Sequence, residues 1–376
     1  MKINHYGVRT WIEVERSVLK HNLSQFRELI APECKIMAVA KSNAYGHGLY
    51  DYSLAMDKLE VDWFAVDSVT EALTLRKKGI KKPILILGHT LPERLEEALS
   101  ANISLTVSSF DALREIDRLN FKKKFKIHLK IDTGMRRQGF LPEEIDELTE
   151  ILLKMENIEV EGIYTHFAEA KDPKDTEFTT LQTARFIEAF SKLEALGFKP
   201  IRHACATAGT LIYPSAHFDM VRLGIGLYGY FPSLNLKKQF EKRIDLRPAL
   251  SWRATISEVK AIKKGERISY DLTEKMRRNG KIAIIPVGYW QGFPRSLSSK
   301  GKVLINGQYA KVLGRVTMDM IIVDISKIDC KTGSTATIIG SDLNKQITAY
   351  EIAETAGQNY YEFITRLNPL IKKIYT

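Results

Sequence analysis

The chain has 376 residues, 44% of them hydrophobic, and a formal net charge of +11 at pH 7. This length is sufficient for two compact units, and no apolar run approaches the roughly 18 residues of a membrane-spanning helix. The positive charge would suit nucleic acid or an anionic membrane surface, but the lysines are scattered and no nucleic-acid-binding motif is present. We interpret the charge as a solvated surface.

The cysteines give no sign of a disulfide framework or a zinc site. Cys34, Cys205 and Cys330 are widely spaced, odd in number and outside any metal-ligand pattern. The first residues, "MKINHYGVRTWIEVE", lack the apolar stretch of a signal peptide. We therefore expect reduced thiols, no metal and a cytoplasmic location.

The first two-thirds of the chain alternates short apolar runs with longer amphipathic segments, which is typical of repeated βαβ units. Eight strands are predicted, at residues 35–41, 62–68, 83–88, 103–109, 125–132, 160–167, 201–207 and 220–229. Helices are predicted between them, for example at 68–79, 91–102 and 141–156. This pattern predicts an α/β fold in which residues 12–235 form a (β/α)8 TIM-like barrel.

The pattern changes after residue 230. Residues 231–248 are predicted to be a linker. Strand-like runs follow at 249–262, 281–289, 302–314, 320–326 and 335–340. The Asn306-Gly307 pair predicts a two-residue hairpin turn. We therefore expect a mainly β C-terminal domain at 236–376.

A lysine follows the first predicted barrel strand in "MAVAKSNAYGHG". Side chains just past barrel strands point into the catalytic mouth. Lys41 is then either a Schiff-base nucleophile, with its amine freed by partial burial, or a lysine whose head reaches solvent at the rim.

Other residues favour the interpretation of Lys41 as a Schiff-base nucleophile. Four lie in or just after further barrel strands: Arg137, His166, His203 and Arg222. Three further residues fall in the loops where barrels commonly bind phosphate: Thr207, Gly224 and Ile225. An amine, a phosphate cradle and an arginine together fit pyridoxal 5'-phosphate.

On these residues the chain resembles the alanine racemases, pyridoxal-phosphate enzymes of fold type III, over nearly its whole length. The matching motifs are "AVAKSNAYGHG", "KIDTGMRRQGF", "YTHFAEA", "VRLGIGLYG", "ISYD", "PVGYWQGFPR", "GRVTMDM" and "NYYEF". The resemblance implies production of D-amino acids for cell-wall precursors by a head-to-tail homodimer. It also implies that residues 1–11 pack with the β domain, which completes the active site of the partner subunit.

The resemblance also implies the roles of the central residues. Lys41 would hold the cofactor and act as base on one face of the substrate Cα, with Tyr270 from the partner subunit on the other, because racemisation needs a proton path on each face. His166 would assist Tyr270. Arg222, backed by His203, would face the pyridine nitrogen and leave it unprotonated, since an arginine keeps its own proton.

The remaining assignments concern the phosphate and the substrate. By resemblance, the phosphate is held by Tyr45, Thr207, Gly224, Ile225 and Tyr361. The substrate-binding set comprises Arg137, Met318, Asp319 and Tyr289, with Tyr289 at the entrance. Arg137 would hydrogen-bond the phenolic oxygen of the cofactor or the substrate carboxylate, and Lys130 matches a lysine that is carbamylated in some members and orients this arginine.

The chain departs from the family pattern at several positions. Arg136 and Asp271 stand where glycine is common, Ala206-Thr207 and Trp290-Gln291 replace Asn-Ser and Ala-Asp, and Asn359 replaces an apolar residue. A buried amide favours a substrate hydroxyl, so Asn359 is a candidate partner for serine. The vancomycin-resistance serine/alanine racemases, in which a membrane domain precedes a similar module, are relatives, and both amino acids are expected substrates.

Three alternatives remain at this point. A non-catalytic pyridoxal-phosphate carrier would lack the β domain and Tyr270, and a fold type III amino-acid decarboxylase would need an acid at the position of Arg222. A nucleic-acid-binding role rests on net charge alone.

Overall fold

The computed structural model describes residues 7–119, 121–172, 174 and 176–376, and the chain divides into two compact units. The first unit contains residues 17–44 and 52–247. The second contains residues 45–51, residues 248–376 and the described residues up to Arg16. The second unit is thus assembled from three separate stretches of sequence.

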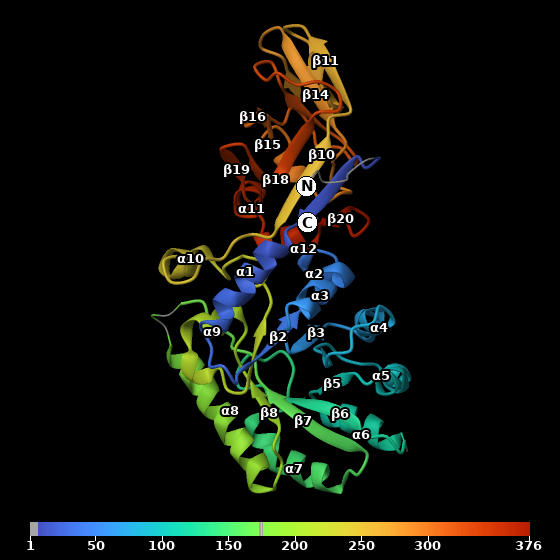
Figure 1. Ribbon diagram of the computed structural model, residues 1–376, viewed down its shortest axis with the longest axis vertical. Helices are drawn as coiled ribbons and strands as arrows, with labels where there is room; N and C mark the ends of the chain where they lie inside the picture. Colours follow the sequence, from blue (N-terminus) through green and yellow to red (C-terminus); the bar gives the residue numbers. More distant parts are fainter. Residues whose placement is uncertain (1–6, 120, 173, 175) are drawn as a thin grey trace. The chain divides into compact units, whose positions relative to one another are not determined.

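Eight parallel strands form the sheet of the first unit, in the order β8-β7-β6-β5-β4-β3-β2-β9 (Figure 1). They are β2 (Lys35–Val39), β3 (Trp63–Val66), β4 (Ile84–Ile86), β5 (Ser104–Val107), β6 (Phe125–Lys130), β7 (Ile158–Tyr164), β8 (Ile201–His203) and β9 (Met220–Leu223). Hydrogen bonds from the Asp219 N–H to the Arg202 carbonyl (3.1 Å) and from the Arg222 N–H to the Cys205 carbonyl (2.9 Å) bring the two sheet edges together. Each predicted run overlaps one strand, so the predicted barrel is confirmed.

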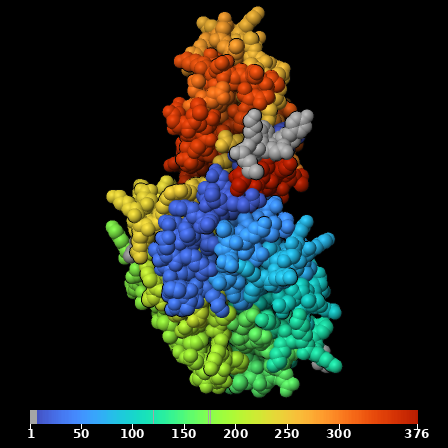
Figure 2. Space-filling model, in the orientation of Figure 1, coloured from blue at the N-terminus to red at the C-terminus, as the bar shows by residue number. Residues whose placement is uncertain are grey.

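Helices precede, separate and follow the barrel strands. They are α1 (Arg16–Arg27), α3 (Leu49–Lys58), α4 (Val69–Lys77), α5 (Leu95–Ser100), α6 (Phe110–Arg118), α7 (Ile145–Lys154), α8 (Glu177–Ala195), α9 (Thr207–Ile212) and α10 (Leu234–Phe240). In α6, for example, Leu113 and Ile116 are buried, and the Ser109 hydroxyl caps the first turn. Figure 2 shows the first unit, coloured from blue through green to yellow, as a closely packed surface.

The end of the barrel unit lies beyond the predicted boundary at residue 235. The expected linker, residues 231–248, contains α10, whose N-terminus is capped by the Ser233 hydroxyl. The Asn22 side chain in α1 accepts a hydrogen bond from the Arg247 N–H (2.9 Å) and donates to the Arg247 carbonyl (2.8 Å). These contacts with α1 keep the segment in the first unit as far as Arg247.

The second unit is built mainly of strands. They are β1 (Thr10–Val14), β10 (Leu250–Thr255), β11 (Glu258–Ile262), β12 (Arg267–Ile268), β13 (Glu274–Lys275), β14 (Gly280–Ile285), β15 (Lys302–Ile305), β16 (Gln308–Lys311), β17 (Ile321–Asp324), β18 (Thr335–Asp342), β19 (Lys345–Ile347) and β20 (Lys372–Tyr375), with the helices α11 (Ala349–Ala356) and α12 (Tyr360–Thr365). The main sheet has the order β16-β15-β18-β10-β1-β20, β19 pairs with β18, and β11-β14-β17 and β12-β13 form smaller sheets. The predicted β-rich domain is confirmed.

Strand β1 corrects the expected start of the barrel at residue 12. It pairs antiparallel with β10 and parallel with β20, so residues 12–14 belong to the sheet of the second unit. Partners more than 200 residues away leave no local signal in the sequence. Of the N-terminal segment expected to join the β domain, residues 1–6 lie outside the described part of the chain.

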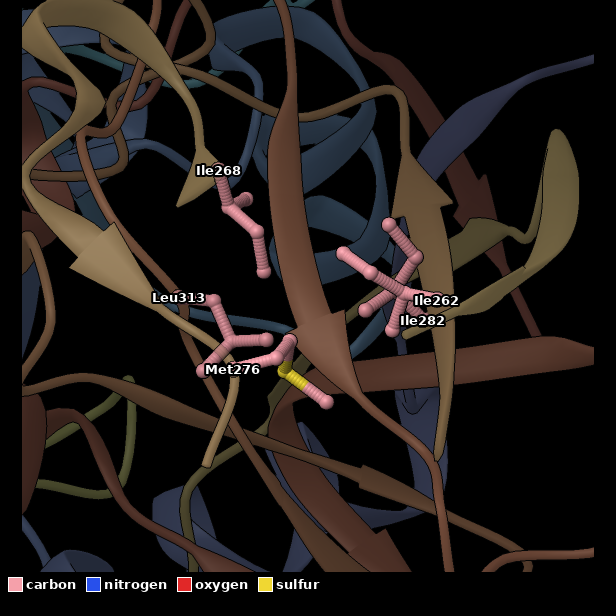
Figure 3. Close-up of a cluster of buried hydrophobic side chains, with 5 residues drawn as sticks. All are labelled: Ile262, Ile268, Met276, Ile282 and Leu313. Carbon is pink, nitrogen blue, oxygen red and sulfur yellow. The ribbon is translucent and has the colours of Figure 1, made fainter. Parts of the chain in front are cut away.

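The second unit contains the predicted hairpin turn and a hydrophobic cluster next to the loop that carries Tyr270. Asn306 (φ 49°) and Gly307 (φ 69°) connect β15 to β16, as two left-handed residues do in the predicted hairpin turn. A hydrophobic cluster joins β11, β12 and β14 to the ends of β13 and β16 (Figure 3). Its members are Ile262, Ile268, Met276, Ile282 and Leu313, with Ile322 packed against it.

No helix in the described part of the chain is both long enough and apolar enough to span a membrane.

Candidate active site

Lys41 stands two residues beyond the end of β2, at the carboxyl end of the barrel strands. It begins α2 (Lys41–Tyr45), a left-handed turn in which Ser42, Asn43, Ala44 and Tyr45 all have φ between 51° and 56°. The Lys41 Nζ lies 3.2 Å from Asp67 Oδ1, and 37% of the lysine side chain is exposed. The amine is therefore accessible at the place where barrel enzymes bind their ligands.

Arg222 is the buried centre of the barrel site, with 3% of its surface exposed. Its Nη1 donates to His203 Nδ1 (3.0 Å) and the His203 carbonyl (2.9 Å). Its Nη2 donates to the carbonyls of Thr165 (2.7 Å) and Ala204 (2.9 Å) and lies 3.2 Å from His166 Nδ1. Burial lowers the pKa of Arg222 to about 10, so the guanidinium stays protonated at neutral pH.

The fixed charge of Arg222 determines which nitrogens carry protons in the neighbouring histidines. Because a guanidinium only donates, His203 Nδ1 must accept, and His203 Nε2–H then donates to His128 Nδ1 (2.8 Å). The remaining His128 nitrogen, Nε2, carries the hydrogen and lies 3.4 Å from Glu161 Oε2. Gly162 permits this arrangement, since a Cβ there would lie 2.2 Å from His128 Nδ1.

Both ends of this hydrogen-bonded series are charged and its middle is neutral. Burial lowers the pKa of His203 well below its usual range, and the nearby charge of Arg222 acts in the same direction. Burial raises the pKa of Glu161, but the nearby His128 together with hydrogen bonds from Lys126 and Ser104 outweighs it and brings the pKa to about 2. The barrel interior therefore holds a donor chain from Arg222 through two neutral histidines to a carboxylate.

His166 is neutral for the same reason. Burial, followed by the charge of Arg222, lowers its pKa well below the usual range. Since His166 Nδ1 faces the guanidinium and must accept, its hydrogen is on Nε2. This leaves an N–H donor at the barrel mouth for another group.

Tyr164 and Lys130 complete the inner wall. The Tyr164 ring stacks on His203 with a centroid separation of 4.8 Å. The Lys130 Nζ lies 4.5 Å from the centre of the same ring, is buried, and makes no hydrogen bond to any described residue. Burial, and then the charges of Arg222 and Arg137, lower the pKa of Lys130 well below its usual range. Lys130 is thus a buried and unsatisfied amine whose charged form is disfavoured.

The Arg137 backbone is held by a carboxylate. Asp132 accepts hydrogen bonds from the N–H groups of Gly134 (2.9 Å), Arg136 (3.0 Å) and Arg137 (3.0 Å). Burial raises the pKa of Asp132, but these bonds outweigh it and lower the pKa. Arg136 has φ 56°, a left-handed backbone that glycine adopts more easily than other residues.

The expected phosphate residues lie in two groups. Thr207 begins α9, and its hydroxyl accepts from the Gly226 N–H (3.3 Å), while Gly224 and Ile225 directly follow β9. Tyr45 and Tyr361 belong to the second unit, where their ring centroids lie 6.4 Å apart. Burial raises the pKa of Tyr45 to about 12 and also raises that of Tyr361, so both phenols keep a proton to donate.

Tyr270 lies on a strained loop of the second unit between β12 and β13. Ser269 (φ 67°, ψ −179°) occupies a region almost reserved for glycine, and Asp271 (φ 58°) and Leu272 (φ 51°) are left-handed. The Ser269 hydroxyl donates to the Arg315 carbonyl (3.0 Å), and the Arg315 Nε lies 3.4 Å from Asp271 Oδ2. The cluster in Figure 3 anchors both sides of this loop, through Ile268 before it and Met276 after it.

The remaining second-unit residues expected at the substrate site, Tyr289, Met318 and Asp319, lie on two loops that hydrogen bonds join. The Tyr289 N–H donates to the Thr317 carbonyl (3.0 Å), and the Trp290 N–H donates to the Met318 carbonyl (2.9 Å). The buried Gln291 accepts from the Gly288 N–H (2.8 Å) and donates to Asp319 Oδ1 (3.1 Å). Gln291 therefore has a structural role that ties the Tyr289 turn to the Met318-Asp319 loop.

Asn359 is exposed and caps α12, because its side-chain oxygen accepts from the Tyr361 N–H (2.9 Å). This bond engages the side-chain oxygen, which can only accept, and the donor of the amide is its side-chain NH2 group.

These residues fit pyridoxal 5'-phosphate. The barrel supplies an accessible amine, a buried arginine whose Nε–H takes no part in the five bonds described above, and a neutral histidine. Fold and site together define an enzyme of the pyridoxal-phosphate barrel class with a second, mainly β unit.

Comparison with known proteins gives the family. The alanine racemase N-terminal domain model matches residues 14–232, and the alanine racemase C-terminal domain model matches residues 249–375. An alanine racemase of Methanococcus maripaludis is 39% identical over 97% of this chain and 98% of its own length, and one of Leptospira interrogans is 38% identical over 97% and 95%. The solved alanine racemase of Clostridium difficile 630 superposes with a TM-score of 0.93 at 35% identity, covering 98% of this chain and 96% of its own.

The chain belongs to the alanine racemase family, and its cofactor is pyridoxal 5'-phosphate. In the structure, Lys41, His166, His203 and Arg222 lie in the barrel strands or just beyond their ends. Sequence reasoning missed His128 and Glu161, which lie within strands and look like alternating residues. It also missed Asp67 and Glu71, for which the only signal was the helix-capping pattern Ser68-x-x-Glu71.

Proposed function

We propose that this chain interconverts L- and D-alanine with Lys41 and Tyr270 as the two proton-transferring residues. The observation that carries this proposal is the combination of an accessible lysine at the barrel mouth with a buried, permanently protonated Arg222. The bound cofactor supplies the electron withdrawal that weakens the substrate Cα–H bond. Lys41 would hold the cofactor and move a proton at its Nζ on one face of Cα.

Tyr270 would move a proton at its phenolic oxygen on the opposite face. The Nε2–H of His166 would stabilise this oxygen when it is deprotonated, since the charge of Arg222 keeps His166 neutral. The Arg222 Nε–H would donate to the pyridine nitrogen and keep that nitrogen unprotonated. The phosphate would be held by Tyr45, Thr207, Gly224, Ile225 and Tyr361.

The active unit in this proposal is a homodimer in which the second unit of each subunit completes the site of the other. Support comes from a group of large apolar side chains exposed on the second unit: Tyr270 (70%), Leu272 (54%), Tyr289 (44%), Trp290 (57%), Met318 (55%) and Met320 (45%). Exposed apolar groups of this kind mark interaction surfaces. They include three of the residues expected at the site of the partner, where Asp319 and Met318 would contact the substrate carboxylate and Tyr289 would line the entrance.

L-Alanine should be racemised by the purified, cofactor-loaded protein, and chiral chromatography of the products measures this directly. L-Serine should also react if the Asn359 amide can donate to a hydroxyl. Asn359→Asp is the informative variant, because it keeps the capping oxygen and removes the side-chain N–H donor. A fall in the serine-to-alanine ratio of kcat/KM of about tenfold is expected.

The capping role of Asn359 provides the control. Asn359→Ala also removes the cap and should cost about 1 kcal/mol of stability, measured by urea unfolding. If Asn359→Asp leaves the serine-to-alanine ratio unchanged, Asn359 serves only as a cap and takes no part in substrate choice. Use of the D-alanine in cell-wall precursors is part of the same proposal.

Lys130 should carry a carbamate. Its unsatisfied amine would attack carbon dioxide through nitrogen, forming an N–C bond and releasing one proton to solvent, and the resulting anion would be attracted by Arg137. With carbon-13-labelled bicarbonate, a carbamate signal is expected in the NMR spectrum of the wild type and of Lys81→Met, an exposed control. The signal should vanish in Lys130→Met, and its persistence there would place the modification elsewhere.

A further inference from the structure

The turn that begins with Lys41 is strained. Ser42, Asn43 and Ala44 have φ, ψ values of 56°, 52°; 56°, 40°; and 51°, 51°. For residues other than glycine, this conformation costs roughly 1–2 kcal/mol each. The hydrogen bond from the Ala44 N–H to the Ala40 carbonyl (2.8 Å) closes the turn but does not fix its direction. Restraints from outside the turn are therefore required.

Glu71 provides such a restraint from the first turn of α4. Its Oε1 accepts from the Ser42 N–H (2.8 Å), and its Oε2 accepts from the Asp67 N–H (2.8 Å). Hydrogen bonds to an ionised carboxylate are stronger than neutral ones. The Ser68 hydroxyl caps the Glu71 N–H (3.3 Å), so the glutamate itself is firmly placed. One carboxylate thus joins the loop after β2 to the loop after β3.

The two loops that Glu71 joins carry the lysine and its partner. Asp67 Oδ1 lies 3.2 Å from the Lys41 Nζ, and the Asp67 backbone is fixed by the same glutamate that fixes Ser42. A glutamate three residues after a helix cap ordinarily bonds back to the cap residue. Here the carboxylate instead extends beyond its own helix to the lysine-bearing turn.

We propose that Glu71 is a positioning residue for Lys41. By bonding the N–H groups of both Ser42 and Asp67, it holds the left-handed turn so that the Lys41 amine is placed to condense with the cofactor aldehyde, forming a C=N bond and releasing one water. This inference rests on the proposed function, because it assumes that Lys41 is the residue that receives the cofactor.

The test measures attachment of the cofactor and needs no amino-acid substrate. Pyridoxal phosphate is added to the apoprotein, the visible absorbance of the bound cofactor is titrated, and borohydride reduction followed by peptide mass mapping locates the attachment at Lys41. Glu71→Ala should weaken cofactor affinity and slow attachment by about 10- to 100-fold, as expected for a reacting group displaced by about 1 Å. Glu115→Ala, which removes a surface ion pair with Arg118 on α6, should behave as the wild type.

Two further variants separate positioning from folding. Glu71→Gln keeps one acceptor oxygen and should be impaired less than Glu71→Ala. Glu71→Asp keeps the charge but is too short to reach both N–H groups, so it should also attach the cofactor slowly while giving a wild-type circular dichroism spectrum. Wild-type attachment by Glu71→Asp and Glu71→Gln would overturn the proposal even if Glu71→Ala does not fold.

The outcome is distinguishable from failure of the proposed function. If the wild type attaches the cofactor at Lys41 but racemises no amino acid, the proposed function fails while the attachment assay still tests Glu71. If the wild type racemises alanine and every Glu71 variant attaches the cofactor normally, the role of Glu71 fails alone.

Discussion

Lys41→Ala and Tyr270→Phe should each be inactive alone, and a mixture of the two should be active. Lys41→Ala removes both the attachment point and one base, so a loss of about 10⁴-fold or more in kcat is expected. Tyr270→Phe removes one base and should cost about 10²–10⁴-fold. In deuterium oxide, Tyr270→Phe should still exchange the α-proton of one enantiomer through Lys41 without inverting it, which racemisation assays alone do not reveal.

Complementation follows from the proposed sharing of sites between subunits. In a mixed dimer, one site combines the intact Lys41 of the Tyr270→Phe chain with the intact Tyr270 of the Lys41→Ala chain, and the other site lacks both. With random pairing of equal amounts, half of the dimers are mixed, so about a quarter of wild-type activity is expected. Each chain is separately tagged, and the mixed dimer, purified after co-expression, should show about half of wild-type activity because one of its two sites is complete.

The control is a chain that carries both substitutions. Mixed with the wild type, it gives a dimer in which each site retains only one of the two residues, so the mixed dimer should have no fully active site. If this dimer is active and the complementing dimer is not, Lys41 and Tyr270 act within one subunit, and the proposed shared site is wrong.

Arg222→Gln should damage both stability and reaction control. Glutamine supplies two N–H donors where Arg222 makes five bonds, so carbonyls such as that of Thr165 lose their partner. An unsatisfied buried polar group costs about 1–3 kcal/mol, and a loss of about 3 kcal/mol is expected in urea unfolding. Racemisation should fall by about 10²–10³-fold, while pyruvate and pyridoxamine phosphate accumulate faster per turnover, because a protonated pyridine nitrogen favours transamination.

Arg202→Gln is the matched control. Arg202 also lies on the barrel wall, in β8, but it pairs with Asp219 and is about one-third exposed. Its replacement should cost about 1 kcal/mol and leave the ratio of pyruvate to D-alanine unchanged. An unchanged ratio in Arg222→Gln as well would separate Arg222 from control of the reaction and leave it only a structural role.

The sequence was sufficient for the barrel because each strand is a short apolar run between amphipathic helices. It was insufficient for β1, whose partners lie at the far end of the chain, and for α10, whose seven residues carry a weak apolar pattern within a lysine-rich stretch. Local patterning identifies elements, but pairing over more than 200 residues depends on the assembled fold.

The site also contains residues that local sequence patterns predict and residues that only the assembled fold brings together. Lys41 and Arg222 were predictable because strand ends of a barrel point to one mouth. Glu71 was not, since its contact with Ser42 spans 29 residues and depends on how two loops meet. The left-handed backbone of Arg136 and Asp271 was also hidden, because both residue types are unremarkable in a sequence.

The series from Arg222 through His203 and His128 ends at Glu161, which lies within β7 rather than beyond its carboxyl end. Lys130, His128 and Lys126 occupy alternate positions of β6, and Lys126 bonds Glu161 (2.8 Å) near the start of that strand. Replacement of Lys126 or Glu161 is therefore expected to disturb the charge balance around Arg222 through the two intervening histidines, although neither residue lies at the mouth of the barrel.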